Sequence, residues 1–453
     1  MKRSEARLFG LLLVLAVVVS LVPMMATPQT ISANHGILID SLPFVADQAG
    51  ETYYLDSDLT CSSSTESGIT IKAAGITIDG RGNKITGPGC ESDRITIGVW
   101  NYDEAMDHGF DDVTIKDLEV ENFCVGIRLQ GAGDPNTGAC TKTIENNTIK
   151  GCKVHDCGLE GGLGHSATGI DFFPCVCHSI VTKCEVYNIV GGGSPLPPCE
   201  GGGMGIRLFS SCSHNDVTCN DLHDNDGAGI MSKMKCEHNY IAYNNVVNNG
   251  LYDAEGTTGG IIARCKLSNN WIIEKNKVAD NYGAGIFAGG SDIVVKCNTI
   301  AGTLAKDSGT DLYRGYGISG RSDGSQRVQV RDNSVCDSGI GYAWPQDIRP
   351  TFPPDDPPGD AWILENNTCD LCRSCTCEYD CSNRVTTYFD FDEDGIYSAA
   401  SCLSCGNALG VGSCCNPGQF DATGIAGGHC SSERCNCQTT AGTDINDCVY
   451  YTP

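Results

Sequence analysis

The chain has 453 residues, with 56 acidic side chains against 30 basic ones, a formal net charge of -26 and 29 cysteines. Such acidity argues against a nucleic-acid partner and favours solubility, cation binding or a salty habitat. A cytosolic protein would seldom keep so many thiols, so the cysteine count argues against a reducing compartment and favours disulfides formed outside the cell.

The N-terminus has the pattern of a signal peptide. Lys2, Arg3 and Arg7 precede an apolar run from Leu8 to Val22, and small residues follow to Ala26. A membrane anchor is the alternative, but the run is short for a span. We therefore expect residues 1–26 to be removed from a secreted or cell-surface protein, with no membrane span after cleavage.

A Gly-Ile pair recurs ahead of short strand-like runs through the middle of the chain. The pairs begin at Gly126, Gly169, Gly205, Gly229, Gly260, Gly285, Gly317 and Gly339, at intervals of 22 to 43 residues. An Asn-rich motif precedes most of them, as in NDLHDN from Asn220 and NNVVNN from Asn244. Periodic repeats of this length indicate a solenoid. The apolar runs are short, β-branched and alternating, which favours coils of strands over helical repeats.

Asn suits the turns of such coils, because it tolerates the left-handed region and its amide can bond a neighbour one coil away. Stacked coils would build an Asn ladder around an interior of Ile, Val and Leu. The predicted fold class is therefore all-β, a right-handed parallel β-helix over residues 27–372 with a Pro-rich insertion at 345–358. A small disulfide-rich module at 373–453 follows it.

The segment ITIDGRGNKITG, from Ile76 to Gly87, and the Asn-rich coils resemble right-handed β-helix proteins grouped with the periplasmic copper-reductase accessory family. That group resembles in fold the β-helix domains of pectate lyases, epimerases and polygalacturonases. The resemblance spans roughly Gly36 to Cys372. It implies the fold and does not fix the chemistry.

The strands that follow the Gly-Ile pairs carry a basic and aromatic stripe. If each Ile points inward, the residues one and three positions further on point outward. These positions and a nearby loop supply Arg128, Arg207, Phe209, Lys233, Arg264, Arg321, Tyr313 and Arg314. Arginine forks bind carboxylates and flat rings cover sugar faces, so we expect the stripe to bind an acidic polysaccharide or cell-surface glycan. Alternatively, Asp171 pairs with Arg128 and Arg207 on rungs about 4.8 Å away, in an ordinary solvated sheet.

Whether the chain is an enzyme stays open at this point. A polysaccharide lyase or epimerase needs a base and a group that neutralises the uronate carboxylate, whereas a hydrolase needs two carboxyl groups. Loops beside the stripe offer His155, Asp156, Glu160, His165, Tyr252, Asp253, Glu255, Asp307, Asp311, Tyr313, Arg314 and Tyr316. The motif sets of polygalacturonases and alginate epimerases are missing. A structural surface or sheath component is a third possibility.

The solenoid cysteines fall at similar points of neighbouring coils. Cys177, Cys212, Cys236 and Cys265 each follow a Gly-Ile pair closely. Coils about 4.8 Å apart lie within the Cα separation that a disulfide accepts, so a bridge between Cys212 and Cys236 is expected. The alternative is that each is a small buried apolar residue.

The C-terminal region holds thirteen cysteines between Cys369 and Cys448, a density typical of a small disulfide-stapled module. Within it, Asp390, Asp392 and Asp394 followed by Gly395 form the first half of a calcium loop. The usual twelfth-position Glu is replaced by Ser401, so Asp444 or Asp447 would complete the site. This region is similar to metal-binding repeats of microbial surface proteins; a solvated acidic turn is the alternative.

Overall fold

The structure, a computed structural model, describes residues 36–90, 95–158, 167–191, 202–251, 259–264, 267–304, 315–320, 327–336, 338, 348–349, 363–369, 386–389 and 398–401. The chain divides into two units, Met1–Ile37 and Leu38–Pro453. Every regular element in the described ranges is a strand. No helix among those residues is long and apolar enough to span a bilayer. The predicted signal peptide lies outside them.

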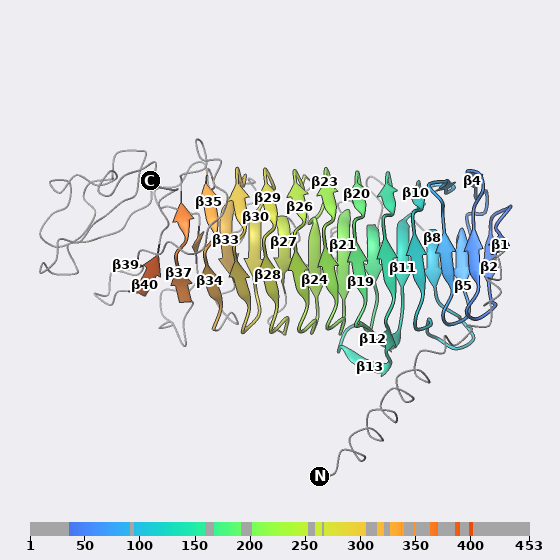
Figure 1. Ribbon diagram of the computed structural model, residues 1–453, viewed down its shortest axis with the longest axis horizontal. Coiled ribbons are helices and arrows are strands. Elements are labelled where there is room, and N and C mark those ends of the chain that lie inside the picture. The colour runs from blue at the N-terminus through green and yellow to red at the C-terminus, as the bar shows by residue number, and fades with distance from the viewer. Residues whose placement is uncertain are drawn as a thin grey trace, which may run out of the picture. The chain divides into compact units, whose positions relative to one another are not determined.

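The unit from Leu38 is a stack of coils, and successive coils add parallel strands to three long sheets (Figure 1). Sheet A comprises β1 (Ile37–Leu38), β3 (Thr52–Tyr54), β6 (Thr77–Asp79), β9 (Thr114–Lys116), β15 (Thr148–Lys150), β19 (Ile180–Thr182), β22 (Asp216–Thr218), β25 (Tyr240–Ala242), β28 (Ile272–Glu274), β31 (Val294–Lys296), β34 (Gln329–Arg331) and β37 (Ile363–Glu365).

Sheet C follows sheet A within each coil. It comprises β4 (Leu59–Thr60), β7 (Lys84–Thr86), β10 (Glu119–Glu121), β16 (Lys153–His155), β20 (Glu185–Tyr187), β23 (Asp221–His223), β26 (Asn245–Val247), β29 (Lys277–Ala279), β32 (Thr299–Ala301), β35 (Ser334–Cys336) and β38 (Thr368–Cys369).

Sheet B completes the coil. It comprises β2 (Phe44–Ala46), β5 (Ile69–Ile71), β8 (Ile97–Asn101), β11 (Val125–Leu129), β17 (Thr168–Phe172), β21 (Met204–Phe209), β24 (Ile230–Lys233), β27 (Gly259–Ala263), β30 (Ala284–Ala288), β33 (Tyr316–Gly320) and β36 (Ile348–Arg349). Short pairs are formed by β12 (Ala132–Asp134) with β13 (Ala139–Lys142), β14 (Ile144–Glu145) with β18 (Val176–Cys177), and β39 (Thr386–Phe389) with β40 (Ser398–Ser401).

The fold is a right-handed parallel β-helix, as predicted. Each coil visits sheets A, C and B in turn, and connections between successive parallel strands of one sheet are right-handed in nearly all proteins. The Ile residues of the Gly-Ile pairs stack in register in sheet B, where Ile206 pairs with Ile170 and Ile230. All three are fully buried. The repeated pair therefore reports an interior column of the solenoid.

The glycine of the pair is required by close stacking. A Cβ atom on Gly205 would lie 2.6 Å from the carbonyl oxygen of Gly229, and one on Gly285 would lie 2.5 Å from that of Gly317. Real Cβ atoms do not approach so closely, so larger residues would push the coils apart. At the position before each buried Ile, the backbone of the next coil lies too close for any side chain, which explains why Gly precedes Ile.

Three corners of the coil carry the Asn ladders that the sequence predicts. The amide of Asn244 donates to the side-chain oxygen of Asn276 at 3.0 Å and to the carbonyl of Val217 at 2.9 Å. Its own oxygen accepts from the backbone and amide nitrogens of Asn220, both at 3.0 Å. The ladder of this corner runs through Asn220, Asn244, Asn276, Asn298, Asn333 and Asn367. Buried amides are thus satisfied from coil to coil.

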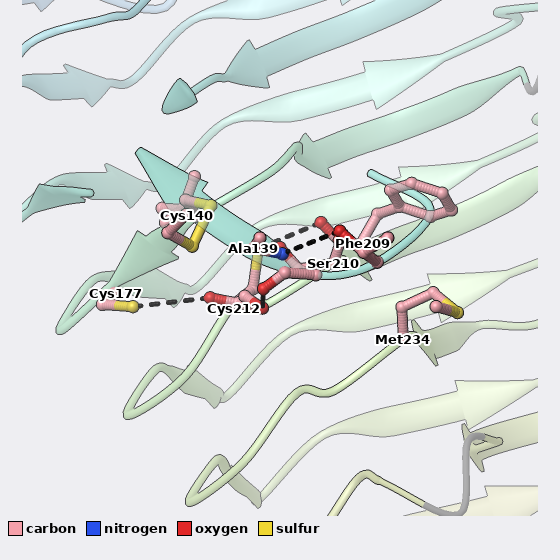
Figure 2. The surroundings of a disulfide bond; sticks show 12 residues. Ala139, Cys140, Cys177, Phe209, Ser210, Cys212 and Met234 are labelled. Carbon is pink, nitrogen blue, oxygen red and sulfur yellow. Dashed lines mark hydrogen bonds between the residues drawn. A yellow bond between two sulfur atoms is a disulfide. The ribbon is translucent and has the colours of Figure 1, made fainter. Parts of the chain in front are cut away.

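Disulfides are present, but the predicted bridge is wrong. Cys90 bonds Cys124 and Cys140 bonds Cys175, the latter at the hairpin of β12 and β13 (Figure 2). Cys212 and Cys236 are buried free thiols. They lie on neighbouring coils, and each S–H group has a backbone carbonyl within reach, that of Phe172 at 3.4 Å for Cys212 and that of Leu208 at 3.3 Å for Cys236. The alternative, that these cysteines are small buried apolar residues, therefore holds for this pair, and their S–H groups have hydrogen-bond partners.

Candidate functional site

The outward face of sheet B places Arg128 and Arg207 of the predicted stripe in one column. Trp100, Arg128, Asp171 and Arg207 pair in register on β8, β11, β17 and β21. The next column along the strands includes Phe173 and Phe209. We call Trp100, Arg128, Phe173, Arg207, Phe209 and Lys233 the cation–aromatic patch.

At its centre, Asp171 is held between two arginines. Arg128 Nε donates to Asp171 Oδ2 at 2.9 Å, and Arg207 donates through Nε and Nη2 to both carboxylate oxygens at 2.8 Å. Asp171 is 0% exposed, Arg207 4% and Arg128 9%. Burial raises the pKa of Asp171, but the charges of Arg207 and Arg128 outweigh it and hold that pKa below its usual value.

This triad has the ion pairs of the alternative weighed from the sequence, although that alternative placed them in a solvated sheet, and it corrects the expectation of an open stripe. The expectation placed both guanidinium groups in solvent, ready for a ligand. They are instead buried, because a carboxylate removed from water needs paired donors to stay ionised. Their role in the patch is to carry charge and to hold the rings beside them.

Aromatic rings cover the arginines. Phe173 and Phe209 stack with centroids 5.0 Å apart. The guanidinium carbon of Arg128 lies 5.1 Å from the Phe173 centroid, and that of Arg207 lies 4.9 Å from the Phe209 centroid. Lys233 Nζ is 4.8 Å from the Phe209 centroid. Phe173 and Lys233 remain half-buried, so they present the accessible part of this cluster.

Sequence reasoning missed the aromatic end of the patch. Trp100 is half-buried, stacks on Tyr102 with centroids 4.6 Å apart, and donates from Nε1 to Gln130 Oε1 at 3.2 Å. It could have been found from the sequence, because Trp100 precedes the first Gly-Ile pair by one coil and occupies the same outward position as Arg128. Adding it extends the patch by one rung.

Further along sheet B the outward column becomes apolar. Met231, Ile262 and Phe287 follow Arg207 in register, are buried to within 1% and cluster with Met204 and Ala284. Arg264 is half-buried on the coil of Ile262. Arg321, Tyr313 and Arg314 lie outside the described residues. The structure thus brings together Arg128, Arg207, Phe209 and Lys233 from the predicted set.

Of the residues considered for catalysis the structure describes three, and these do not gather beside the patch. His155 ends β16 in sheet C, Asp156 follows it, and Tyr316 is buried in β33 of sheet B. Candidates outside the described residues are Glu160, His165, Tyr252, Asp253, Glu255, Asp307 and Asp311. Asp390, Asp392 and Asp394, proposed for calcium, also lie outside them, as do Asp444 and Asp447.

No family model matches the chain, and no curated protein matches it. Among solved structures it is similar to the Dettilon tailspike protein gp208, with 15% identity, TM-score 0.46, and coverage of 66% of this chain and 54% of the tailspike. It is also similar to pectate lyase Pel9A, with 11% identity, TM-score 0.41, and coverage of 67% and 77%.

A third similar structure is a double mutant of the periplasmic alginate epimerase AlgG, with 14% identity, TM-score 0.42, and coverage of 72% of this chain and 78% of the epimerase. The chain spans about half the length of the tailspike that it matches. At these identities the likeness concerns the fold alone, and no substrate is transferred from it.

Proposed function

We propose that the chain is an exported protein that binds an anionic polysaccharide through the cation–aromatic patch. The observation that carries the proposal is the composition of the patch: two guanidinium groups share the single carboxylate of Asp171, and Lys233 lies over the neighbouring Phe209 ring, in a chain of net charge -26. A local excess of positive charge attracts a polyanion even where the whole protein would repel it.

The residues of the patch would contribute to binding in different ways. Arg128 and Arg207 are held in place by Asp171 and supply positive charge beside the aromatic rings. Half-buried Trp100 and Phe173 offer ring surface to the apolar faces of sugars, and Lys233 offers an ammonium group to a carboxylate or sulfate. Sugars on successive rungs would then follow the outward face of sheet B.

Affinity electrophoresis of the purified chain in polygalacturonate gels tests the proposal. Lys233→Ala should weaken binding about tenfold, since a hydrogen bond to a charged group contributes about 1.5 kcal/mol or more. Lys277→Ala, which removes an exposed lysine from sheet C, is the matched control and should leave binding unchanged. Equal losses in both variants, or equal retardation in neutral dextran gels, would contradict a specific patch.

The same incubations separate binding from cleavage. A lyase acting on the polymer would produce unsaturated ends and raise the ultraviolet absorbance with time, whereas a binding protein leaves the absorbance constant. Steady product formation by the wild-type chain would replace the binding proposal by the lyase alternative.

A further inference from the structure

The outward face of sheet C, away from the cation–aromatic patch, carries a histidine held between carboxylates. Glu119 and Glu121 of β10 pair in register with Lys153 and His155 of β16. The His155 side chain is 7% exposed, and its ring stacks on Tyr187 with centroids 4.8 Å apart and planes 7° apart. The imidazole is therefore fixed in one orientation.

Both ring nitrogens of His155 face carboxylate oxygens. Nδ1 lies 2.6 Å from Asp156 Oδ2, while Nε2 lies 3.1 Å from Glu119 Oε1 and 3.8 Å from Glu121 Oε2. A neutral imidazole donates one hydrogen bond and accepts one. With the proton on Nδ1 toward Asp156, the Nε2 lone pair points at two anions. A metal cation at that position would face the lone pair and both carboxylates at once.

We propose that Glu119, Glu121 and His155 bind a divalent first-row transition-metal cation. The ligand atoms would be His155 Nε2 and one carboxylate oxygen from each glutamate, and they lie within 4.8 Å of one another. Imidazole nitrogen with carboxylate oxygen is a donor set that suits zinc and its neighbours.

The surrounding residues already hold these ligands in place. Asp156 accepts from Nδ1, which is the usual outer partner of a metal-binding histidine. Thr86 Oγ1 donates to Glu121 Oε1 at 2.8 Å and Lys84 Nζ lies 3.0 Å from the same atom. Oε2 of Glu121 is the oxygen that faces the histidine. Two of the three ligands, His155 and Glu121, are thus held by neighbouring side chains, which distinguishes the cluster from a chance group of acids.

A related cluster two coils along is looser and serves as a comparison. In Glu185, Asp221 and His223, Nε2 of the histidine lies 3.5 Å from Glu185, and its side chain is 27% exposed. Asp221 Oδ1 accepts from Asn245 at 2.7 Å, which engages one of its oxygens. The His-Asp dipeptide recurs there, since Asp224 lies 2.7 Å from His223 Nδ1. The tighter cluster at His155 is the one that we assign to the metal.

Cobalt(II) titration of the chelator-stripped full chain tests the assignment, with visible absorption as the readout. Nitrogen and oxygen ligands give visible bands without the intense thiolate charge-transfer band, so cobalt on cysteines is counted separately. His155→Asn and Glu119→Gln should each lose one bound equivalent. Asp156→Asn should weaken that equivalent by about 10- to 100-fold, the range typical of outer partners.

Two matched controls sharpen the test. Glu185→Gln alters the looser cluster, and His214→Gln alters the middle ring of the stacked His178, His214 and His238; both should keep the equivalent. Metal-free melting temperatures report folding, and Glu119→Gln is the decisive variant because it is isosteric and half-exposed. The assignment is overturned if the wild type lacks a saturable equivalent, if Glu119→Gln and His155→Asn retain it, or if His214→Gln removes it.

Discussion

The outward faces of sheets B and C follow the same alternation of side chains but lie in different environments. On sheet B, Asp171, Met231 and Phe287 are buried although they point away from the coil interior. On sheet C, the corresponding positions carry charged residues such as Glu119 and Glu185 that remain half-exposed. Alternation fixes the side to which a residue points, whereas burial depends on what packs over that side.

The same charge pair therefore has different consequences on the two faces. The Asp171 pairs measure 2.8 and 2.9 Å with both partners buried, but Lys153 and Glu185 lie 3.7 Å apart with more than 40% of each side chain exposed. Buried charges depend on their partners, while exposed pairs contribute little. Substitutions on the two faces should separate these regimes.

The largest effect is expected from Asp171→Asn. The variant leaves two buried guanidinium groups without a counter-charge, which should cost about 3–5 kcal/mol. The denaturation midpoint of the β-helix, followed by far-ultraviolet circular dichroism in urea, measures the change. A loss below about 1 kcal/mol would mean that Asp171 and its two arginines are solvated after all.

A second effect compares the interior of the coil with its outward face. Asn244→Ala removes the amide that satisfies Asn220, Asn276 and Val217, and should destabilise the fold by about 1–3 kcal/mol for each buried group left unpaired. Its neighbour Asn245 points outward and donates to Asp221 at 2.7 Å, so Asn245→Ala is the control and should cost less than about 1 kcal/mol. Equal denaturation midpoints for Asn244→Ala and Asn245→Ala would show that the Asn ladder does not contribute specifically to stability.

The interior could be predicted from the sequence because each repeat reports it independently. Ile206, Ile230 and the Asn220 ladder occupy identical sites on stacked coils, so the pattern is averaged over many copies. The outward face of sheet B offers no such redundancy. Arg128, Asp171 and Arg207 alternate in sign from coil to coil, and their burial depends on long-range packing.

The sites show the same limit. Alternation of side chains alone predicts the stripe. It gives the register of Arg207 correctly, but it does not predict that Arg207 is buried. The cluster at His155 was missed because residues 34 and 36 positions apart meet only once the register of β10 and β16 is known. The thiols of Cys212 and Cys236 were correctly expected to lie on neighbouring coils, yet adjacency does not decide their oxidation.

A third prediction concerns pH. The pKa of Asp171 is lowered in the folded state, so its contribution to stability is present above its unfolded pKa of about 3.9 and is lost as pH falls through the folded value. One proton changes stability by at most about 1.4 kcal/mol per pH unit. Denaturation midpoints measured from pH 5 downward should fall more steeply for the wild type than for Asp171→Asn. Parallel curves would show that other groups govern acid unfolding.

The smallest effect is expected from Glu185→Gln on sheet C, which makes the same chemical change as Asp171→Asn on the opposite kind of face. Its pairs with Lys153 and His223 are long and partly exposed, so solvent and salt already screen them, and their loss should change stability by less than about 0.5 kcal/mol. Midpoints in low and high salt measure it, and the small difference should vanish in high salt. A loss approaching that of Asp171→Asn would show that sheet C is covered as sheet B is, and that burial does not distinguish the two faces.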